Sequence, residues 1–226
     1  MSPFDEALPA PGAAKEVFLA GPAGRLEAVI AAPRSAAAGV AVICHPHPLY
    51  GGALSNKVVY MLASCALKAG LFALRFNFRG VGRSEGQYDA ARGETEDALA
   101  AVAWLGERRP GAPLLLAGFS FGAHVALKAA ARARPAALVS VSIPFGRYFD
   151  DAAPPPHPGC PWLALHARDD EVVNYEETRA ALQAYRPPPQ LVTVDGAGHF
   201  WHGRLGDIQQ TVLPFLERHF ASERKP

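Results

Sequence analysis

The chain has 226 residues, of which 50% are hydrophobic and 19% are charged, an ordinary composition for one globular domain that can bury a core without disulfides. Its 22 basic and 21 acidic side chains leave a net charge of +1. Because no strong field of either sign results, we expect neither nucleic acid nor an anionic membrane as a partner.

The first sixteen residues contain two early acids and three prolines, and they lack the basic start and apolar run of a secretory signal. They predict a poorly ordered leader over residues 1–16, followed by one domain over 17–220 and a tail over 221–226. No run of about 18 apolar residues free of charge and proline occurs, so we expect a soluble, cytoplasmic protein.

The domain begins with residues 17–32, which predict two short strands around a Gly/Pro turn, an antiparallel hairpin. Apolar runs and helical patterns then alternate along the chain. The strand-like runs are 39–46, 71–78, 113–120, 136–145, 161–170 and 190–195. The helical patterns are 56–70, 94–109, 121–135, 174–185 and 205–220. Such alternation predicts an α/β fold with a mostly parallel central sheet and helices on both faces.

One stretch, residues 146–159, shows neither strand nor helix periodicity and contains three consecutive prolines. It predicts a loop. Because fourteen residues are too few to fold into a separate cap domain, we expect an open, shallow site beneath it.

The sequence Gly118-Phe119-Ser120-Phe121-Gly122 lies where a predicted strand passes into a predicted helix. This G-x-S-x-G pattern is typical of a nucleophile elbow, in which a strained turn presents the serine hydroxyl and the flanking glycines allow strand and helix to approach. The following helix points its N-terminus and the Phe121 amide toward a developing oxyanion. Ser120 is therefore the candidate nucleophile.

A serine needs a base within hydrogen-bond reach and a carboxylate that orients this base. His199 follows the strand 190–195, and the adjacent acids Asp169 and Asp170 end the strand 161–170. The chain order Ser, Asp, His and the placement of each residue after a strand fit an α/β site. From position alone, either acid could orient His199.

Five segments carry a resemblance to a known superfamily: HPHPLYGG, FNFRGVGRSEG, GFSFG, HARDDEVVN and GAGHF. With them the chain resembles the α/β-hydrolase superfamily over nearly all of residues 17–220, and within it a group of small, lidless bacterial serine hydrolases. The resemblance implies hydrolysis without naming a substrate. It aligns Asp170 with the acid of the catalytic triad, while Asn174 stands where proline is common.

The resemblance also places a second oxyanion donor in the loop after residues 39–44, where Pro46 replaces a glycine. Proline has no amide hydrogen, so the available donors are His47, Leu49 and Tyr50. The register favours the His47 backbone amide, beside that of Phe121.

Aromatic residues gather in the segments expected around the nucleophile, and they predict an apolar binding surface. The candidate substrate contacts are Tyr50, Phe119, Phe145 and Phe200.

His45 and His47 could instead suggest zinc, but no H-E-x-x-H or similar ligand set accompanies them. His45 is better explained as bracing its loop through hydrogen bonds. The three cysteines, Cys44, Cys65 and Cys160, are widely separated, so they predict neither a disulfide framework nor a metal site and fit a reducing compartment. We expect no metal and no cofactor.

These observations predict a serine hydrolase that cleaves small carboxylic esters or thioesters through an acyl-enzyme. Its partner would be a small-molecule ester, with the oligomeric state left open. A peptidase or amidase would use the same three residues. A non-catalytic binding protein on this fold is the third alternative, but such proteins usually lose a triad member.

Overall fold

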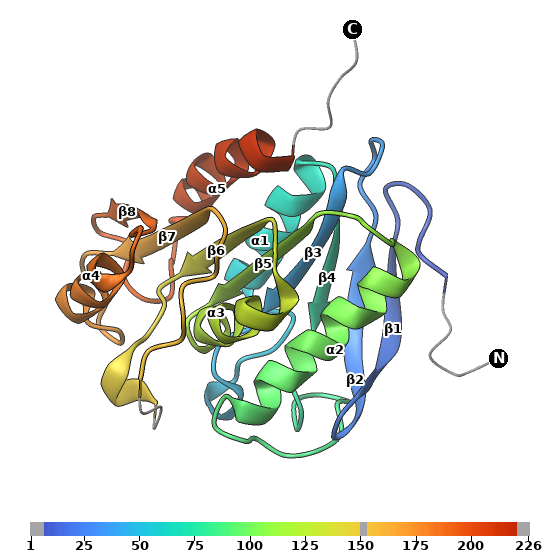
Figure 1. Ribbon diagram of the computed structural model, residues 1–226, viewed down its shortest axis with the longest axis horizontal. Coiled ribbons are helices and arrows are strands. Elements are labelled where there is room, and N and C mark those ends of the chain that lie inside the picture. Colours follow the sequence, from blue (N-terminus) through green and yellow to red (C-terminus); the bar gives the residue numbers. More distant parts are fainter. Residues whose placement is uncertain (1–6, 150–152, 221–226) are drawn as a thin grey trace, which may run out of the picture.

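The computed structural model describes residues 7–149 and 153–220, which form a central sheet covered by helices (Figure 1). The strands are β1 (Ala14–Gly21), β2 (Gly24–Ala31), β3 (Gly39–Cys44), β4 (Leu71–Phe76), β5 (Leu114–Phe119), β6 (Ala137–Val141), β7 (Trp162–Ala167) and β8 (Gln190–Val194). The helices are α1 (Lys57–Lys68), α2 (Arg92–Arg108), α3 (Phe121–Ala133), α4 (Tyr175–Ala184) and α5 (Leu205–Phe220), with 3₁₀ turns η1 (Pro48–Tyr50) and η2 (Gly146–Tyr148).

The strands pair in the order β1-β2-β4-β3-β5-β6-β7-β8. The pairs β1/β2 and β2/β4 are antiparallel, and every pair from β4 to β8 is parallel. The mostly parallel α/β sheet with an N-terminal antiparallel hairpin is confirmed. Because parallel strands end at one edge, the loops that follow β3, β5, β7 and β8 meet there.

The hairpin begins earlier than the sequence predicts. Ala14 and Lys15 pair with Ala31 and Ile30, so part of the predicted leader belongs to β1, and Leu8 packs against the core. Backbone pairing explains the difference, since its hydrogen bonds can begin a strand before the first residue of the apolar pattern. Residues 1–6 of the leader and the predicted tail 221–226 lie outside the described residues.

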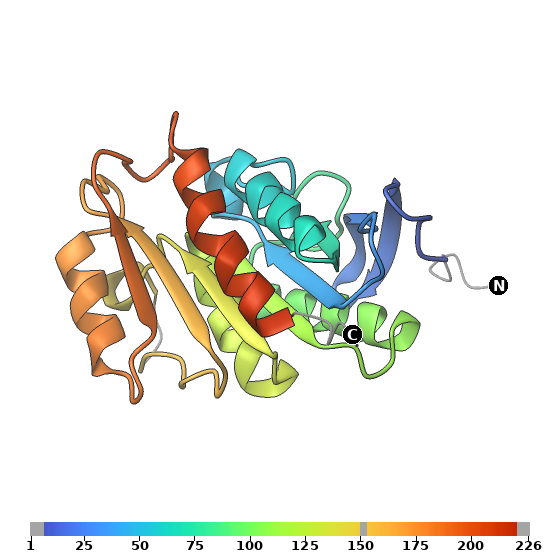
Figure 2. The same cartoon turned by 90° about the horizontal axis from the view of Figure 1, so that it is seen from above.

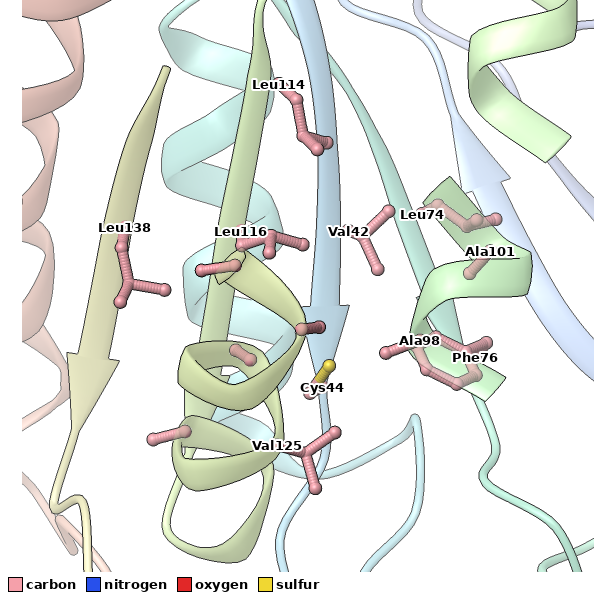
Figure 3. Close-up of a cluster of buried hydrophobic side chains, with 14 of the residues drawn as sticks. Val42, Cys44, Leu74, Phe76, Ala98, Ala101, Leu114, Leu116, Val125 and Leu138 are labelled. Carbon is pink, nitrogen blue, oxygen red and sulfur yellow. The ribbon is translucent and has the colours of Figure 1, made fainter. Parts of the chain in front are cut away.

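Helices cover both faces of the sheet, as Figure 2 shows from above. Helices α1 and α5 pack on one face, and α2 and α3 pack on the other. Successive side chains of β5 lie on opposite faces of the sheet: Leu116 belongs to the cluster under α2 and α3, and Leu115 belongs to the cluster under α1 and α5. Figure 3 shows part of the first cluster, where Val42, Leu74 and Leu116 of three adjacent strands are drawn.

In the connection between β6 and β7, the residues that the structure describes form no lid. Apart from the single 3₁₀ turn η2, its described residues form neither helix nor strand, as predicted for residues 146–159. Among the described residues, no helix is long and apolar enough to cross a membrane.

Candidate active site

Ser120 stands on a strained turn between β5 and α3. Its φ of 53° and ψ of −124° are unusual for a residue with a side chain, and such strain is common at functional sites. A Cβ atom on Gly118 would lie 2.2 Å from the carbonyl oxygen of Gly122, and one on Gly122 would lie 2.3 Å from that of His45. Both positions therefore require glycine. The Ser120 amide also donates to the Val141 carbonyl at 2.8 Å, which ties the turn to β6.

His199 reaches the serine from the loop after β8. Its Nε2 lies 3.1 Å from Ser120 Oγ, and its Nδ1 lies 2.9 Å from Asp170 Oδ2 and 3.0 Å from Oδ1. The carboxylate accepts the Nδ1 hydrogen, which leaves the Nε2 lone pair directed at the hydroxyl. All three side chains are buried or nearly so, and they form one line of hydrogen bonds.

Asp170 is held as a carboxylate in the turn after β7. Burial alone would raise its pKa, but the hydrogen bond from His199, the charge of that imidazole when protonated, and the Val173 amide together hold the pKa below its usual value. Oδ1 accepts the amides of Val172 at 3.0 Å and Val173 at 2.7 Å. Behind it, His166 Nε2 lies 3.5 Å from Oδ2 and donates to the Val173 carbonyl at 3.0 Å. The acid is thus fixed from several sides.

The neighbouring acids bind the backbone of the histidine loop instead. Asp169 Oδ2 accepts the Gly196 amide at 2.6 Å, and Glu171 Oε2 accepts the His199 amide at 2.9 Å. The structure therefore brings Asp170, and not its rival Asp169, to the imidazole. Glu171 was missed by the sequence reasoning, although the unbroken run of three acids after β7 was a visible signal.

Of the three candidate donors in the loop after β3, only the His47 amide lacks an acceptor within the described residues. Leu49 N donates to His47 Nδ1 at 3.2 Å, and Tyr50 N donates to the His47 carbonyl at 3.1 Å, so both alternative donors are occupied. Within the described residues, the amides of His47 and Phe121 have no acceptor. The His47 ring is fixed by the Tyr88 hydroxyl at 3.2 Å and contacts the Phe121 ring at a centroid distance of 4.9 Å.

His45 stabilises this loop through hydrogen bonds of its ring. Its Nδ1 donates to the Pro46 carbonyl at 2.6 Å, and its Nε2 accepts the Phe78 amide at 3.0 Å. Burial lowers its pKa to about 4, so the ring is neutral. Both ring nitrogens are occupied, and the described residues contain no group of three or more His, Cys, Asp or Glu side chains that could hold a metal ion.

The four candidate substrate contacts divide into two pairs. Tyr50 is 86% exposed and Phe200 is 49% exposed, both in loops at the site. Phe119 and Phe145 are buried: Phe119 packs in the cluster under α1 and α5 with its ring centroid 5.2 Å from that of His199, and Phe145 lies beside Tyr185 in the other cluster. All four residues stay predictions as substrate contacts, with Tyr50 and Phe200 the two whose side chains are exposed.

Several known proteins are similar to this chain in sequence and fold. The uncharacterized protein RP471 of Rickettsia prowazekii is 34% identical over 213 residues, which are 89% of this chain and 88% of that protein. The solved structure of XC6422 from Xanthomonas campestris, an α/β serine hydrolase without lid, is 34% identical and has a TM-score of 0.87 over 98% of this chain and 100% of that chain.

A structure of an α/β serine hydrolase homologue from Coxiella burnetii is 39% identical, with a TM-score of 0.84 over 89% of this chain and 97% of that one. The family model of the X-Pro dipeptidyl-peptidase (S15) family matches residues 23–186. The chain therefore belongs to the X-Pro dipeptidyl-peptidase (S15) family within the α/β-hydrolase superfamily, and it is a hydrolase without a lid.

Proposed function

We propose that this protein is a serine hydrolase that cleaves small carboxylic esters or thioesters through an acyl-enzyme. Ser120 is the nucleophile, His199 the general base and Asp170 the acid that orients it. The observation that carries the proposal is the position of His199, with Nε2 3.1 Å from Ser120 Oγ and Nδ1 2.9 Å from Asp170 Oδ2. This is the arrangement that a serine nucleophile needs at neutral pH.

The reaction proceeds in two halves. Ser120 Oγ attacks the ester carbonyl while His199 Nε2 takes the hydroxyl proton, and the negative oxygen that forms is stabilised by the amides of Phe121 and His47. As the tetrahedral intermediate collapses, His199 returns the proton to the leaving oxygen or sulfur. Water, activated by the same imidazole, then hydrolyses the acyl-enzyme and releases a carboxylic acid.

Several features support a small substrate and no added cofactor. The site edge has no lid, and the triad with its two free amides supplies every group that acyl transfer requires. The three cysteines are all free, which supports a reducing, cytoplasmic setting. We propose a small-molecule ester as the partner, rather than nucleic acid or a membrane.

Active-site labelling tests the chemistry directly. A fluorophosphonate should modify wild-type protein, and mass spectrometry should place the modification on Ser120. The Ser120→Ala variant, which removes only the hydroxyl, should take no label and should lose hydrolysis of p-nitrophenyl esters. A folded wild-type protein that neither takes the label nor hydrolyses any ester would contradict the proposal.

Chain-length dependence tests the small-substrate part. In a p-nitrophenyl ester series, acetate and butyrate should give the highest kcat/KM, because the site edge is open and carries no lid to enclose a long chain. A clear preference for long acyl chains would contradict the small-substrate assignment while leaving the serine chemistry intact.

A peptidase is the second candidate, because the matched family is described by dipeptidyl-peptidase activity. The same three residues could cleave an amide. Comparing p-nitrophenyl esters with Xaa-Pro p-nitroanilides separates the two: we expect Ser120-dependent turnover of the esters only. Efficient release of nitroaniline by wild type, lost in Ser120→Ala, would favour the peptidase.

A further inference from the structure

Exposed large hydrophobic side chains are concentrated around the site. Among the described residues there are five, and four of them lie in the loops that follow β3, β7 and β8. These four are Leu49, Tyr50, Val172 and Phe200. The fifth, Tyr60, lies on α1. Scattered apolar residues are normal on a surface, but a concentration at one edge indicates binding of an apolar group.

Val172 and Phe200 occupy the acid and base side of the site. Phe200 follows His199 in the chain, and the two rings meet edge to face with centroids 5.3 Å apart. Val172 is 45% exposed, its amide donates to Asp170 Oδ1, and its carbonyl accepts the Tyr148 hydroxyl at 2.9 Å. Both residues are therefore anchored next to the catalytic pair while their side chains remain exposed.

The direction of proton transfer decides which part of a substrate lies there. The carbonyl oxygen must point to the amides of Phe121 and His47, and the leaving oxygen must come within hydrogen-bond reach of His199 Nε2 to receive its proton. When the acyl C–O bond breaks, the electron pair and this proton depart together with the alcohol. The group beside Phe200 is thus the alcohol and not the acyl group.

We propose that Phe200 and Val172 form a subsite for the leaving alcohol, and that the preferred substrates are esters of aromatic or bulky apolar alcohols. This inference rests on the proposed function, since it requires the acyl-enzyme route through Ser120. It assigns to Phe200 a role in acylation only, because the alcohol has left before water attacks.

The experiment compares benzyl acetate with ethyl acetate, which share an acyl group and differ in the size of the alcohol. In Phe200→Ala, the ratio of kcat/KM for benzyl over ethyl acetate should fall about tenfold, the usual effect of losing an apolar contact in a pocket. Val172→Ala should lower the ratio less, because a smaller side chain is removed. Phe200→Leu should recover part of it, since it keeps apolar surface.

Two controls separate the alcohol subsite from other effects. Tyr60→Ala removes another exposed aromatic ring, on α1 away from the site, and should leave the ratio at its wild-type value. The deacylation rate, measured from the steady phase after a p-nitrophenyl acetate burst, should be the same in Phe200→Ala as in wild type. An equal loss on both acetates, or slower deacylation, would overturn the inference and make Phe200 a support for His199. A wild type inactive on every ester would instead refute the proposed function.

Discussion

The two halves of the site are held in place by different means. On the nucleophile side, Ser120 is fixed by backbone contacts that leave no space for a Cβ on Gly118 or Gly122. On the base side, His199 is fixed by side chains, because Asp170 binds its ring and Glu171 binds its amide. The nucleophile can therefore be displaced only by moving the backbone, whereas the contacts of the base can be removed one at a time.

The largest effect should come from Gly122→Ala. The new methyl group would lie 2.3 to 2.4 Å from the carbonyl oxygens of His45 and Cys44, so α3 would have to move away from β3. We expect ester hydrolysis to fall below detection and the melting temperature to drop.

Gly106→Ala is the matched control, because nothing lies within 4 Å of the new Cβ on this exposed turn of α2. It should keep activity and gain up to about 1 kcal/mol of stability. Wild-type melting and activity in Gly122→Ala would contradict this account of the elbow.

Next in size is Asp170→Asn, which should lower kcat by about 10⁴-fold, the loss expected when the carboxylate that fixes the histidine tautomer becomes an amide. The protein should remain folded, because Oδ1 can still accept the amides of Val172 and Val173. Asp169→Asn is the matched control. It retains an oxygen for the Gly196 amide and should change kcat by less than about tenfold. If Asp169→Asn proved the more damaging, the roles of the two acids would be exchanged.

Much of the nucleophile side could be predicted from sequence, because its constraints are local. The G-x-S-x-G spacing around Ser120 directly predicts the close approach of strand and helix backbones, and the apolar patterns of β5 and α3 predict where the strand ends and the helix begins. The burial of Phe119 beside the His199 ring could not be predicted in the same way. The surroundings of a side chain at a strand end depend on which helices and loops cover that face of the sheet. The neighbouring residues in the sequence do not reveal this.

The base side depends on contacts between distant segments, and the sequence left more open there. It placed His199 and the acids at one edge, because parallel strands end together. It could not separate Asp169 from Asp170 without the resemblance, since adjacent side chains leave a turn in different directions and only the paired loop decides between them. Glu171 was missed for the same reason, as its partner, the His199 amide, lies 28 residues away.

On the nucleophile side, the His45 side chain makes a hydrogen bond that can be removed by itself. This bond makes the stability of the fold depend on pH. His45 accepts the Phe78 amide at Nε2, and this contact is lost on protonation. Its pKa is about 4 in the folded protein against an ordinary 6.5, so the unfolded chain binds the proton first as pH falls. The contribution of His45 is complete above pH 6.5. On the order of 3 kcal/mol is lost between pH 6.5 and 4.

Urea unfolding at pH 7 and pH 4.5 measures this loss. Burial also lowers the pKa of His47 and His166, so these residues add a loss of the same sign. His45→Gln offers the Phe78 amide an acceptor that does not titrate. The drop in unfolding free energy between the two pH values should therefore be smaller in His45→Gln than in wild type. Equal drops in both proteins would show that the ring does not titrate in this way.

The smallest effect should come from Glu171→Ala on the base side. The His199 amide would lose its acceptor and the loop would be less well fixed, while the ring would keep its bond to Asp170. We expect kcat to fall about tenfold through a small misplacement of Nε2, with KM within about twofold and melting little changed. Glu171→Gln should restore most of kcat, because an amide oxygen can accept the same bond.

Glu176→Ala removes another exposed glutamate, on α4. It should behave as wild type, because within the described residues the Glu176 carboxylate forms its ion pair with Arg179 and not with the site. If glutamine were no better than alanine at position 171, the charge and not the hydrogen bond would matter there. If KM rose instead of kcat falling, Glu171 would act on the substrate. Only a kcat loss rescued by glutamine shows that the base side is built from contacts that can be removed singly, in contrast to the nucleophile side.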